Sequence, residues 1–191
     1  MISIGITGII GSGKSMLSQV FRSMDIPVYD ADTRAKELMN NNFTIRIRLK
    51  LEFGEETYRN NKINKEYLRK IVFGDEKNRQ IINSIVHPAV KNDFIAWREK
   101  TGAKIVAIES AIIFDAKLED ILDKIIFVEA AEDILVKRIC FRDNVSEEIA
   151  LNKIKLQREN AGREKCDAIF INDRNHSLIE QAENFINNLK Y

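Results

Sequence analysis

The sequence predicts an α/β fold in which helices cover both faces of a parallel β-sheet. Five short segments are almost entirely apolar and rich in β-branched residues, as expected of strands: residues 2–6, 27–29, 104–108, 124–128 and 168–171. They do not alternate apolar and polar residues, so both faces of each strand are expected to be buried. Longer segments with helical spacing separate them, as the crossover connections of a parallel sheet require.

The helical segments predict how the domain is organised. Short ones are expected at residues 14–24, 132–142, 147–158 and 177–189. The stretch at residues 32–98 is much longer, and Pro88 predicts a boundary in it because His87 should avoid helical geometry. We therefore expect one domain with three parts. Its core is residues 1–32, 99–137 and 166–191, with a helical substrate-binding insert at about 33–98 and a lid at about 138–165.

Composition excludes several classes of protein. Of the 191 residues, 45% are apolar and 31% are charged, which indicates a folded globular chain. The formal net charge of +1 gives no electrostatic reason for a nucleic-acid partner, and the basic residues 46–50 are expected to be a solvated helix face. The longest hydrophobic stretch, residues 105–114, is too short to span a bilayer. Without a secretion signal or cysteine pattern, a cytoplasmic location and no membrane partner are expected.

The first predicted strand leads directly into Gly-Ile-Ile-Gly-Ser-Gly-Lys-Ser at residues 8–15. The pattern Gly-x-x-x-x-Gly-Lys-Ser between a strand and a helix is typical of a P-loop, whose backbone N–H groups converge on nucleotide phosphates. Lys14 is expected to reach the β- and γ-phosphates, and the Ser15 hydroxyl to bind Mg²⁺. A glycine-rich turn with a surface lysine is the alternative, and the flanking strand and helix argue against it.

Two aspartates follow the second predicted strand, in the sequence Asp30-Ala31-Asp32. Ligands of open α/β sheets bind beyond the carboxyl ends of the strands, so a carboxylate here can face a transferred phosphoryl group. If the extended geometry continues, Asp30 and Asp32 point to the same side of the chain. One of them can orient an acceptor hydroxyl and take its proton late in the reaction. The alternative is that they only cap the following helix.

A carboxylate also ends the third predicted strand. Residues 105–108 are apolar and Glu109 follows, which is the form of a Walker B strand. Because Mg²⁺ prefers oxygen ligands, Glu109 is expected to hold it through a water molecule. A buried strand that ends in an acid is common, and the P-loop in the same chain favours the metal site.

The predicted lid carries two arginines on one helix face. Arg138 and Arg142 are four residues apart, so both can meet phosphate charge when a lid closes. A solvated helix face is the alternative. His87, beside Pro88, is expected to be structural instead of catalytic.

In their order and spacing, these motifs resemble the dephospho-coenzyme A kinase family, which phosphorylates the 3′-hydroxyl of dephospho-coenzyme A in the last step of coenzyme A synthesis. The resemblance extends over nearly the whole chain. The residues that carry it are 5–15, 30–32, 85–88, 109–115 and 138–144, with Gln157 and the ending Ile171-Asn172-Asp173.

The resemblance implies a P-loop NTP hydrolase fold with a five-stranded parallel sheet flanked by helices, and it implies ATP, Mg²⁺ and dephospho-coenzyme A as ligands. Position by position, it assigns ATP binding to Gly8, Gly11, Ser12, Gly13, Lys14, Ser15 and Met16, and places Asn172 near adenine. Asp32 is then the candidate base, and Lys14 and Arg142 also act in catalysis.

Some positions depart from the family pattern. Ile9 stands where Gly is common, at a variable position of the loop, and Lys36 stands where Arg is often found. Lys36 keeps the charge but loses bidentate contact. Ser110 and Asp115 replace a more usual Pro and Glu, which leaves the role of the segment after Glu109 open.

Other functions remain as alternatives. The nearest is another nucleotide or small-molecule kinase on the same fold, although the loop lacks the proline of an adenylate kinase. A GTP-binding switch is disfavoured because the sequence has no Asp-x-x-Gly and no Asn-Lys-x-Asp. A non-catalytic ATP-binding module would not need Asp32. The sequence does not indicate an oligomeric state.

Overall fold

The computed structural model of the chain describes residues 1–158 and 161–189. Contacts within the chain divide it into two compact units: Met1–Tyr29 with Thr101–Tyr191, and Asp30–Lys100. In the part of the chain that is described, no helix is both long enough and apolar enough to cross a membrane. The finer division into core, insert and lid stays a prediction.

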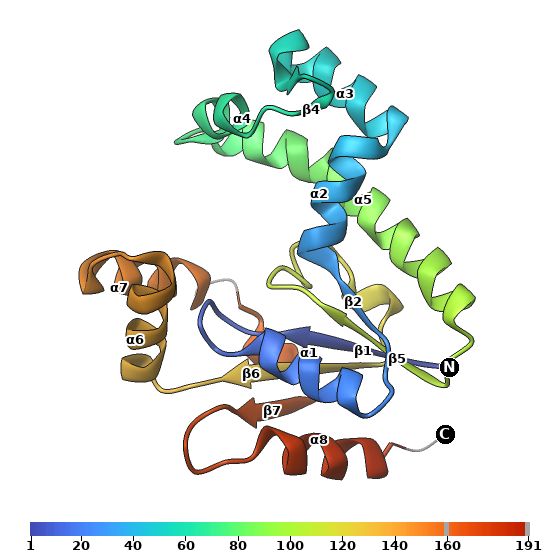
Figure 1. Cartoon of the computed structure of the whole chain (residues 1–191), viewed down its shortest axis with the longest axis vertical. Helices are drawn as coiled ribbons and strands as arrows, with labels where there is room; N and C mark the ends of the chain where they lie inside the picture. Colours follow the sequence, from blue (N-terminus) through green and yellow to red (C-terminus); the bar gives the residue numbers. More distant parts are fainter. Residues whose placement is uncertain (159–160, 190–191) are drawn as a thin grey trace. The chain divides into compact units, whose positions relative to one another are not determined.

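The first unit is built on a five-stranded sheet with the strand order β2-β5-β1-β6-β7 (Figure 1). Its strands are β1 (Ile2–Thr7), β2 (Val28–Asp30), β5 (Ile105–Glu109), β6 (Lys124–Glu129) and β7 (Ala168–Ile171). β1 pairs in parallel with β5 and β6, and β6 pairs in parallel with β7. The predicted parallel sheet is confirmed, and β1 is buried after its first residue, as expected of a central strand.

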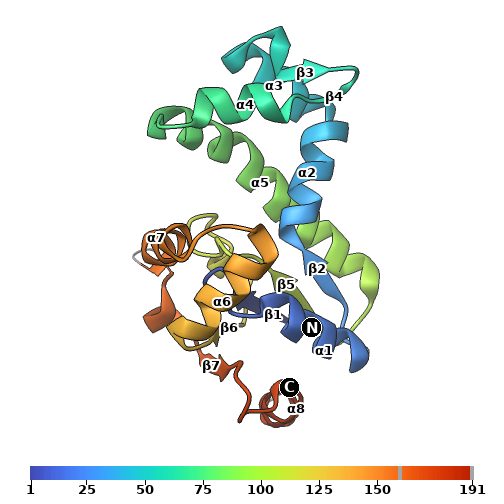
Figure 2. The same ribbon diagram turned by 60° about the vertical axis from the view of Figure 1, so that its left-hand side comes forward.

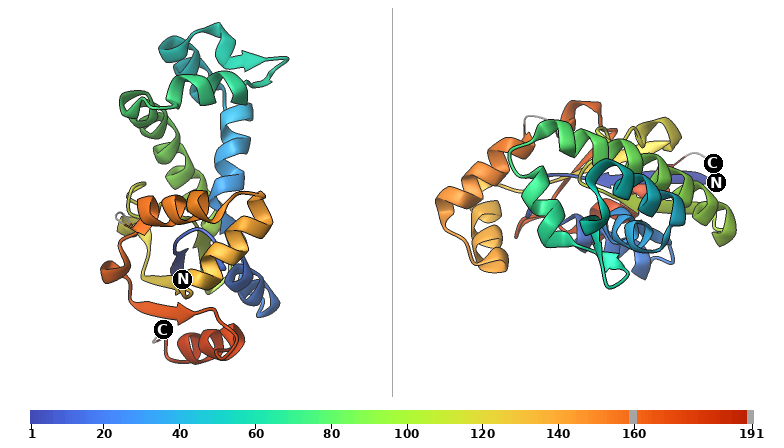
Figure 3. Two further views of the ribbon diagram at one scale, coloured as in Figure 1. Left: turned by 90° about the vertical axis from the view of Figure 1, so that its left-hand side faces the viewer. Right: turned by 90° about the horizontal axis from the view of Figure 1, so that it is seen from above.

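The helices of this unit pack on the sheet in two separate clusters. α1 (Lys14–Ser23) and α8 (Leu178–Asn187) pack against β1 through apolar side chains that include Leu17, Phe21 and Ala182. α6 (Glu132–Asp143) and α7 (Glu147–Arg158) lie side by side (Figure 3) and pack around Ile139 and Ile154. Short 3₁₀ turns occupy Glu119–Ile121 and Arg163–Lys165.

The second unit is mainly helical. It contains α2 (Ala31–Asn41), α3 (Phe43–Phe53), a 3₁₀ turn (Glu55–Thr57), the small hairpin β3 (Tyr58–Arg59) and β4 (Lys62–Ile63), α4 (Lys65–Val72) and α5 (Glu76–Thr101) (Figure 2). Ile45 and Leu49 of α3 pack against Ile85 of α5. An ion pair between Arg34 and Asp93, at 2.9 Å, also joins α2 to α5.

One expectation about this unit is wrong, and one feature of it was not predicted. Pro88 does not mark a boundary, because α5 runs through it from Glu76 to Thr101. An interior proline costs a helix roughly 3 kcal/mol, and burial of Val86, Val90 and Phe94 around it offsets that cost. The hairpin of β3 and β4 was not expected, since two-residue strands leave almost no periodicity to recognise.

Candidate functional site

The P-loop connects β1 to α1 and requires glycine at three positions. Gly8, Gly11 and Gly13 have φ angles of 144°, 79° and 102°, which residues with a side chain rarely adopt. A β-carbon on Gly8 would lie only 2.3 Å from the carbonyl oxygen of Val128 in β6. The glycines therefore let the loop turn and approach β6 closely before α1 begins.

Several backbone N–H groups of the loop are available to a ligand. Within the described residues, the N–H groups of Gly11, Gly13 and Ser15 have no hydrogen-bond partner. Gly13 is the N-cap of α1, and the first N–H groups of a helix have no partner within it. Such groups attract anions through hydrogen bonding and the helix dipole. The loop thus has the geometry of a phosphate site.

The hydroxyl of Ser12 supports the same conclusion. Ser12 is fully buried, and its Oγ has no hydrogen-bond partner in the described chain. Buried polar atoms are almost always paired, because an unpaired one loses its hydration without compensation. A phosphate oxygen in the loop would supply the missing partner, so the residues present fit a nucleotide.

Lys14 folds back over the loop. Its Nζ donates hydrogen bonds to the carbonyl oxygens of Gly8, at 2.9 Å, and Ile9, at 3.2 Å. These bonds hold the positive charge at the loop, where a P-loop lysine neutralises phosphate.

The carboxylate of Glu109 lies between two hydroxyl groups of α1. Ser15 Oγ donates to Glu109 Oε1 at 2.7 Å, and Ser18 Oγ donates to Oε2 at 2.6 Å. The pairing of β1 with β5 places the carboxylate here, because Glu109 at the end of β5 lies opposite Ile6, just before the P-loop. The structure therefore brings together the two residues that the sequence suggested for Mg²⁺. Hydroxyl and carboxylate oxygens suit that ion, which usually keeps several water ligands as well.

The two aspartates after β2 have different positions in the helix that follows. Asp30 is the N-cap of α2, and its carboxylate accepts hydrogen bonds from the N–H and the hydroxyl of Thr33, at 2.9 and 2.8 Å. Asp32 lies in the first turn of α2. The extended geometry does not continue through both residues, because the chain becomes helical at Ala31, so the condition under which they would point to the same side is not met. Asp30 is thus engaged in capping, the alternative raised for it above.

The residue that follows β7 also contacts the P-loop. Asn172, which follows β7 and is 4% exposed, donates a hydrogen bond from Nδ2 to the carbonyl oxygen of Ser12 at 2.7 Å. Arg138 of α6 donates to the carbonyl oxygens of Gly11, at 3.1 Å, and of Asn172, at 3.2 Å. The loop, α6 and the end of β7 are therefore joined by side-chain hydrogen bonds.

A cavity of about 560 Å³ lies between α6 and the segment that joins β7 to α8. Its lining includes Arg138, Lys137 and Ile134 from α6, and Arg174 and Asn175 from the joining segment. Arg138 thus both lines this cavity and contacts the P-loop. Asp133 and Asp173 complete the lining, and the volume is within the usual range of small-molecule sites.

Within the described residues, Arg142 forms no hydrogen bond to the loop. Its Nε and Nη2 donate to the carboxylate of Asp143 at 2.8 and 3.2 Å, and Lys153 donates to the same group at 2.7 Å. The hydrogen bond from Arg142, followed by that from Lys153, holds the pKa of Asp143 well below its usual range. The pKa of Arg142 is raised in turn, chiefly by the same bond. The guanidinium is mostly exposed, so exchange of Asp143 for another anion is sterically open to it.

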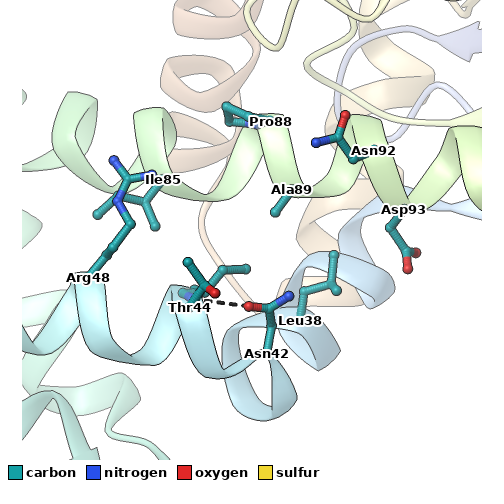
Figure 4. A pocket seen from close by; sticks show the side chains of 10 residues that line it. Leu38, Asn42, Thr44, Arg48, Ile85, Pro88, Ala89, Asn92 and Asp93 are labelled. Carbon is teal, nitrogen blue, oxygen red and sulfur yellow. Dashed lines mark hydrogen bonds between the residues drawn. The ribbon is translucent and has the colours of Figure 1, made fainter.

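The helical unit contains a groove of about 440 Å³ between α3 and α5 (Figure 4). Its apolar lining comes from Leu38, Ile45, Ile85, Pro88 and Ala89, and its polar lining from Asn42, Thr44, Arg48, Asn92 and Asp93. Within the described chain, the side chains of Thr44, Arg48 and Asn92 have no hydrogen-bond or ion-pair partner, whereas Asp93 is paired with Arg34. Among these lining residues, Arg48 therefore places a positive charge without an ion-pair partner beside the apolar surface of the groove.

Sequence reasoning missed three contacts of the phosphate site. The resemblance favours Arg142 of the two lid arginines, but it is Arg138 that contacts the loop here. Ser18 was not selected, although its position one helical turn after Ser15 was a signal that both hydroxyls share a face. Gln157 was part of the resemblance only, yet its Oε1 accepts a hydrogen bond from the N–H of Ile10 at 2.6 Å.

Comparison with known proteins identifies relatives over almost the whole chain. The family model described as dephospho-CoA kinase matches residues 2–178. A dephospho-CoA kinase of Porphyromonas gingivalis is 35% identical over 192 residues, covering 100% of this chain and 95% of the relative. The solved structure of TT1252 from Thermus thermophilus is 27% identical with a TM-score of 0.83, covering 100% of this chain and 98% of the other. A dephospho-CoA kinase structure from Campylobacter jejuni is 21% identical with a TM-score of 0.70, covering 97% and 95%, and shares the fold.

Proposed function

The chain belongs to the dephospho-CoA kinase family, and from this premise we propose that it transfers the γ-phosphoryl group of ATP to the 3′-hydroxyl of dephospho-CoA in the cytoplasm. The products are ADP and coenzyme A, in the last step of coenzyme A biosynthesis. Family membership over residues 2–178 is the observation that carries the proposal. The P-loop geometry supports it independently, because it provides for the phosphate donor.

ATP is proposed to bind with its phosphates in the P-loop. The residues assigned to it are Gly8, Gly11, Ser12, Gly13, Lys14, Ser15, Met16 and Asn172. The unpaired N–H groups and the buried Ser12 hydroxyl support the phosphate position. The cavity lined by Arg138 and Arg174 supports an adenine position next to it.

Ser15 and Glu109 are the residues that would hold Mg²⁺. Ser15 would contribute its hydroxyl oxygen, and Glu109 would hold the ion through a water molecule. When bound, the ion neutralises negative charge on the β- and γ-phosphates. Ser18 would keep Glu109 oriented, because its hydroxyl already donates to the second carboxylate oxygen.

Asp32 is proposed as the general base. Its carboxylate would orient the 3′-hydroxyl and accept the proton as the new P–O bond forms and the bond to the β-phosphate oxygen breaks. Asp30 is the weaker candidate for this role, because capping α2 already engages both of its carboxylate oxygens. Lys14 and Arg142 would stabilise negative charge on the transferring group, and Arg142 would exchange Asp143 for phosphate to do so.

The groove in the helical unit is proposed to receive the phosphopantetheine arm of the acceptor. This arm combines phosphate charge, two amides and apolar carbon atoms. Arg48 can pair with phosphate, Thr44 and Asn92 can hydrogen-bond to amides, and Ile45 and Ile85 can cover the apolar part.

A panel of acceptors tests the proposed function. ADP formation should depend on both Mg²⁺ and dephospho-CoA, and phosphorus NMR with mass spectrometry should locate the new phosphate on the 3′ oxygen. Adenosine and nucleoside monophosphates serve as competing acceptors in the same assay. Turnover with a nucleoside monophosphate but none with dephospho-CoA would show a different kinase on the same fold. Nucleotide binding without any transfer would show a binding module.

A further inference from the structure

One hydrogen bond to the P-loop comes from a residue far along the chain. The backbone N–H of Ile10 donates to Oε1 of Gln157 at 2.6 Å, across 147 positions of sequence. Among the residues that the structure describes, no other side chain accepts a hydrogen bond from a backbone N–H of residues 8–13. Gln157 is the second-to-last residue of α7.

The position of Gln157 is fixed by the packing of α7. Ala150 and Ile154 of α7 are buried in a cluster with Ile139 of α6 and with Ile9, which is 5% exposed although it belongs to the P-loop. An ion pair of 2.5 Å between Arg158 and Glu132 further joins the end of α7 to the start of α6. The loop and α7 therefore belong to one apolar cluster and are also joined by the hydrogen bond.

The peptide group between Ile9 and Ile10 is held on both of its sides. Its carbonyl oxygen, on Ile9, accepts hydrogen bonds from Nζ of Lys14 and from the N–H of Ser12, both at 3.2 Å. Its N–H, on Ile10, donates to Gln157. A peptide group is planar, so a bond that fixes the N–H also fixes the direction of the carbonyl opposite. Loss of the Gln157 bond would therefore remove one restraint on the carbonyl that accepts a hydrogen bond from Lys14.

We propose that Gln157 is a positioning residue for the phosphate donor. It orients the Ile9–Ile10 peptide, and through that peptide it places the Lys14 ammonium and the free N–H of Gly11 for the ATP phosphates. This inference rests on the proposed use of ATP and does not depend on the identity of the acceptor. Because Gln157 is exposed, its substitution should leave the fold intact.

The test compares Gln157→Leu with Lys155→Leu, an exposed position two residues earlier in α7. Calorimetry should show the Kd for ATP about three- to tenfold higher in Gln157→Leu, the effect of one lost hydrogen bond. The Kd for adenosine, which has no phosphate, should not change in either variant. In ¹⁵N-labelled protein, exchange of the Ile10 amide should accelerate in Gln157→Leu only. Gln157→Glu keeps the acceptor oxygen and should keep Ile10 protected.

Two outcomes would overturn the inference. Equal weakening of ATP and adenosine would show that Gln157 acts on the base site or on the fold. Unchanged ATP affinity with a faster-exchanging Ile10 amide would show that the hydrogen bond has no effect on phosphate binding. These readouts use nucleotide binding alone, so they separate this inference from the choice of acceptor. A wild-type protein that binds ATP but fails to phosphorylate dephospho-CoA would contradict the proposed function only.

Discussion

The side-chain amide of Asn172 lies where a β-carbon on Gly13 would have to be. Such an atom would come within 1.8 Å of Asn172 Nδ2, which donates instead to the carbonyl oxygen of Ser12 at 2.7 Å. Glycine at position 13 therefore allows the end of β7 to bond directly to the P-loop. This contact connects the phosphate site to the residues beside the cavity between α6 and the segment that joins β7 to α8.

Replacement of Gly13 tests this relationship. Gly13→Ala should abolish turnover, because the new methyl group displaces Asn172 while the φ of 102° strains the backbone. Gly74→Ala is the matched control, since Gly74 has a φ of 76° but nothing within 4 Å of the added carbon. The control should lose only about 1–2 kcal/mol of unfolding free energy. Adding Asn172→Ala to Gly13→Ala should recover part of the stability in thermal melts. No recovery would show that backbone strain, and not the clash, is the cause.

Substitution of Glu109 tests the magnesium site. Glu109→Gln keeps the size of the side chain but removes the charge between the hydroxyls of Ser15 and Ser18. The Mg²⁺ concentration for half-maximal turnover should rise about 10- to 100-fold, as on loss of an outer-shell metal partner. Glu183→Gln, on the exposed face of α8, is the control and should leave it unchanged. An unaltered Mg²⁺ dependence in Glu109→Gln would assign Glu109 to holding α1 in place.

The sheet and the P-loop could be predicted from sequence because their signals are local. Buried parallel strands appear in the sequence as apolar runs. The glycines of the loop are required by the backbone angles of the loop itself, so they too can be recognised locally. The course of α5 could not be predicted in the same way. Pro88 disfavours a helix locally, and only burial of Phe94 and its neighbours against other segments offsets that preference.

The remaining contacts of the site depend on segments far apart in the chain. The Gln157 bond to Ile10 spans 147 positions and that of Asn172 to Ser12 spans 160, so no local pattern contains them. The role of Asp30 was open for a different reason. A carboxylate before a helix is both a good N-cap and a possible base, and only the bonds to Thr33 distinguish the two.

Paired substitutions at Asp30 and Asp32 separate capping from catalysis. Asp32→Asn should lower kcat by roughly 100- to 10,000-fold, the range of a general base, with ATP affinity nearly unchanged. Asp30→Ala should instead lower the unfolding free energy by about 1 kcal/mol through loss of the α2 cap. Denaturant melts and steady-state kinetics on both variants measure the two effects. Near-normal turnover in Asp32→Asn would make Asp32 structural.

If the groove of the helical unit binds the phosphopantetheine arm, a substitution in it should weaken binding of the acceptor and not of ATP. Arg48→Ala should raise the KM for dephospho-CoA about tenfold or more, as expected when a charged hydrogen bond to phosphate is lost. The KM for ATP should stay the same. Arg59→Ala, an exposed arginine of β3 in the same unit, should change neither constant. Binding of 4′-phosphopantetheine alone should weaken in parallel, and an unchanged KM in Arg48→Ala would exclude the groove as the arm's site.

The partner exchange proposed for Arg142 predicts a change in the pKa of Asp143. In the structure this pKa is lowered by hydrogen bonds from Arg142 and then Lys153, so ionised Asp143 stabilises the fold above its ordinary pKa of about 3.9. That contribution is lost as the pH falls through the lowered value.

If a saturating, non-hydrolysable ATP analogue draws Arg142 away from Asp143, the pKa of Asp143 should rise. The variant Arg142→Ala should raise this pKa without nucleotide. Carboxyl ¹³C NMR titration measures both effects. Asp167 is the control. Burial acts to raise its pKa, but hydrogen bonds from Lys124 and from the N–H of Ile125 lower it. Neither of these donors takes part in the proposed exchange. A pKa of Asp143 that rises in Arg142→Ala but not with the analogue would show that Arg142 keeps Asp143 as its partner.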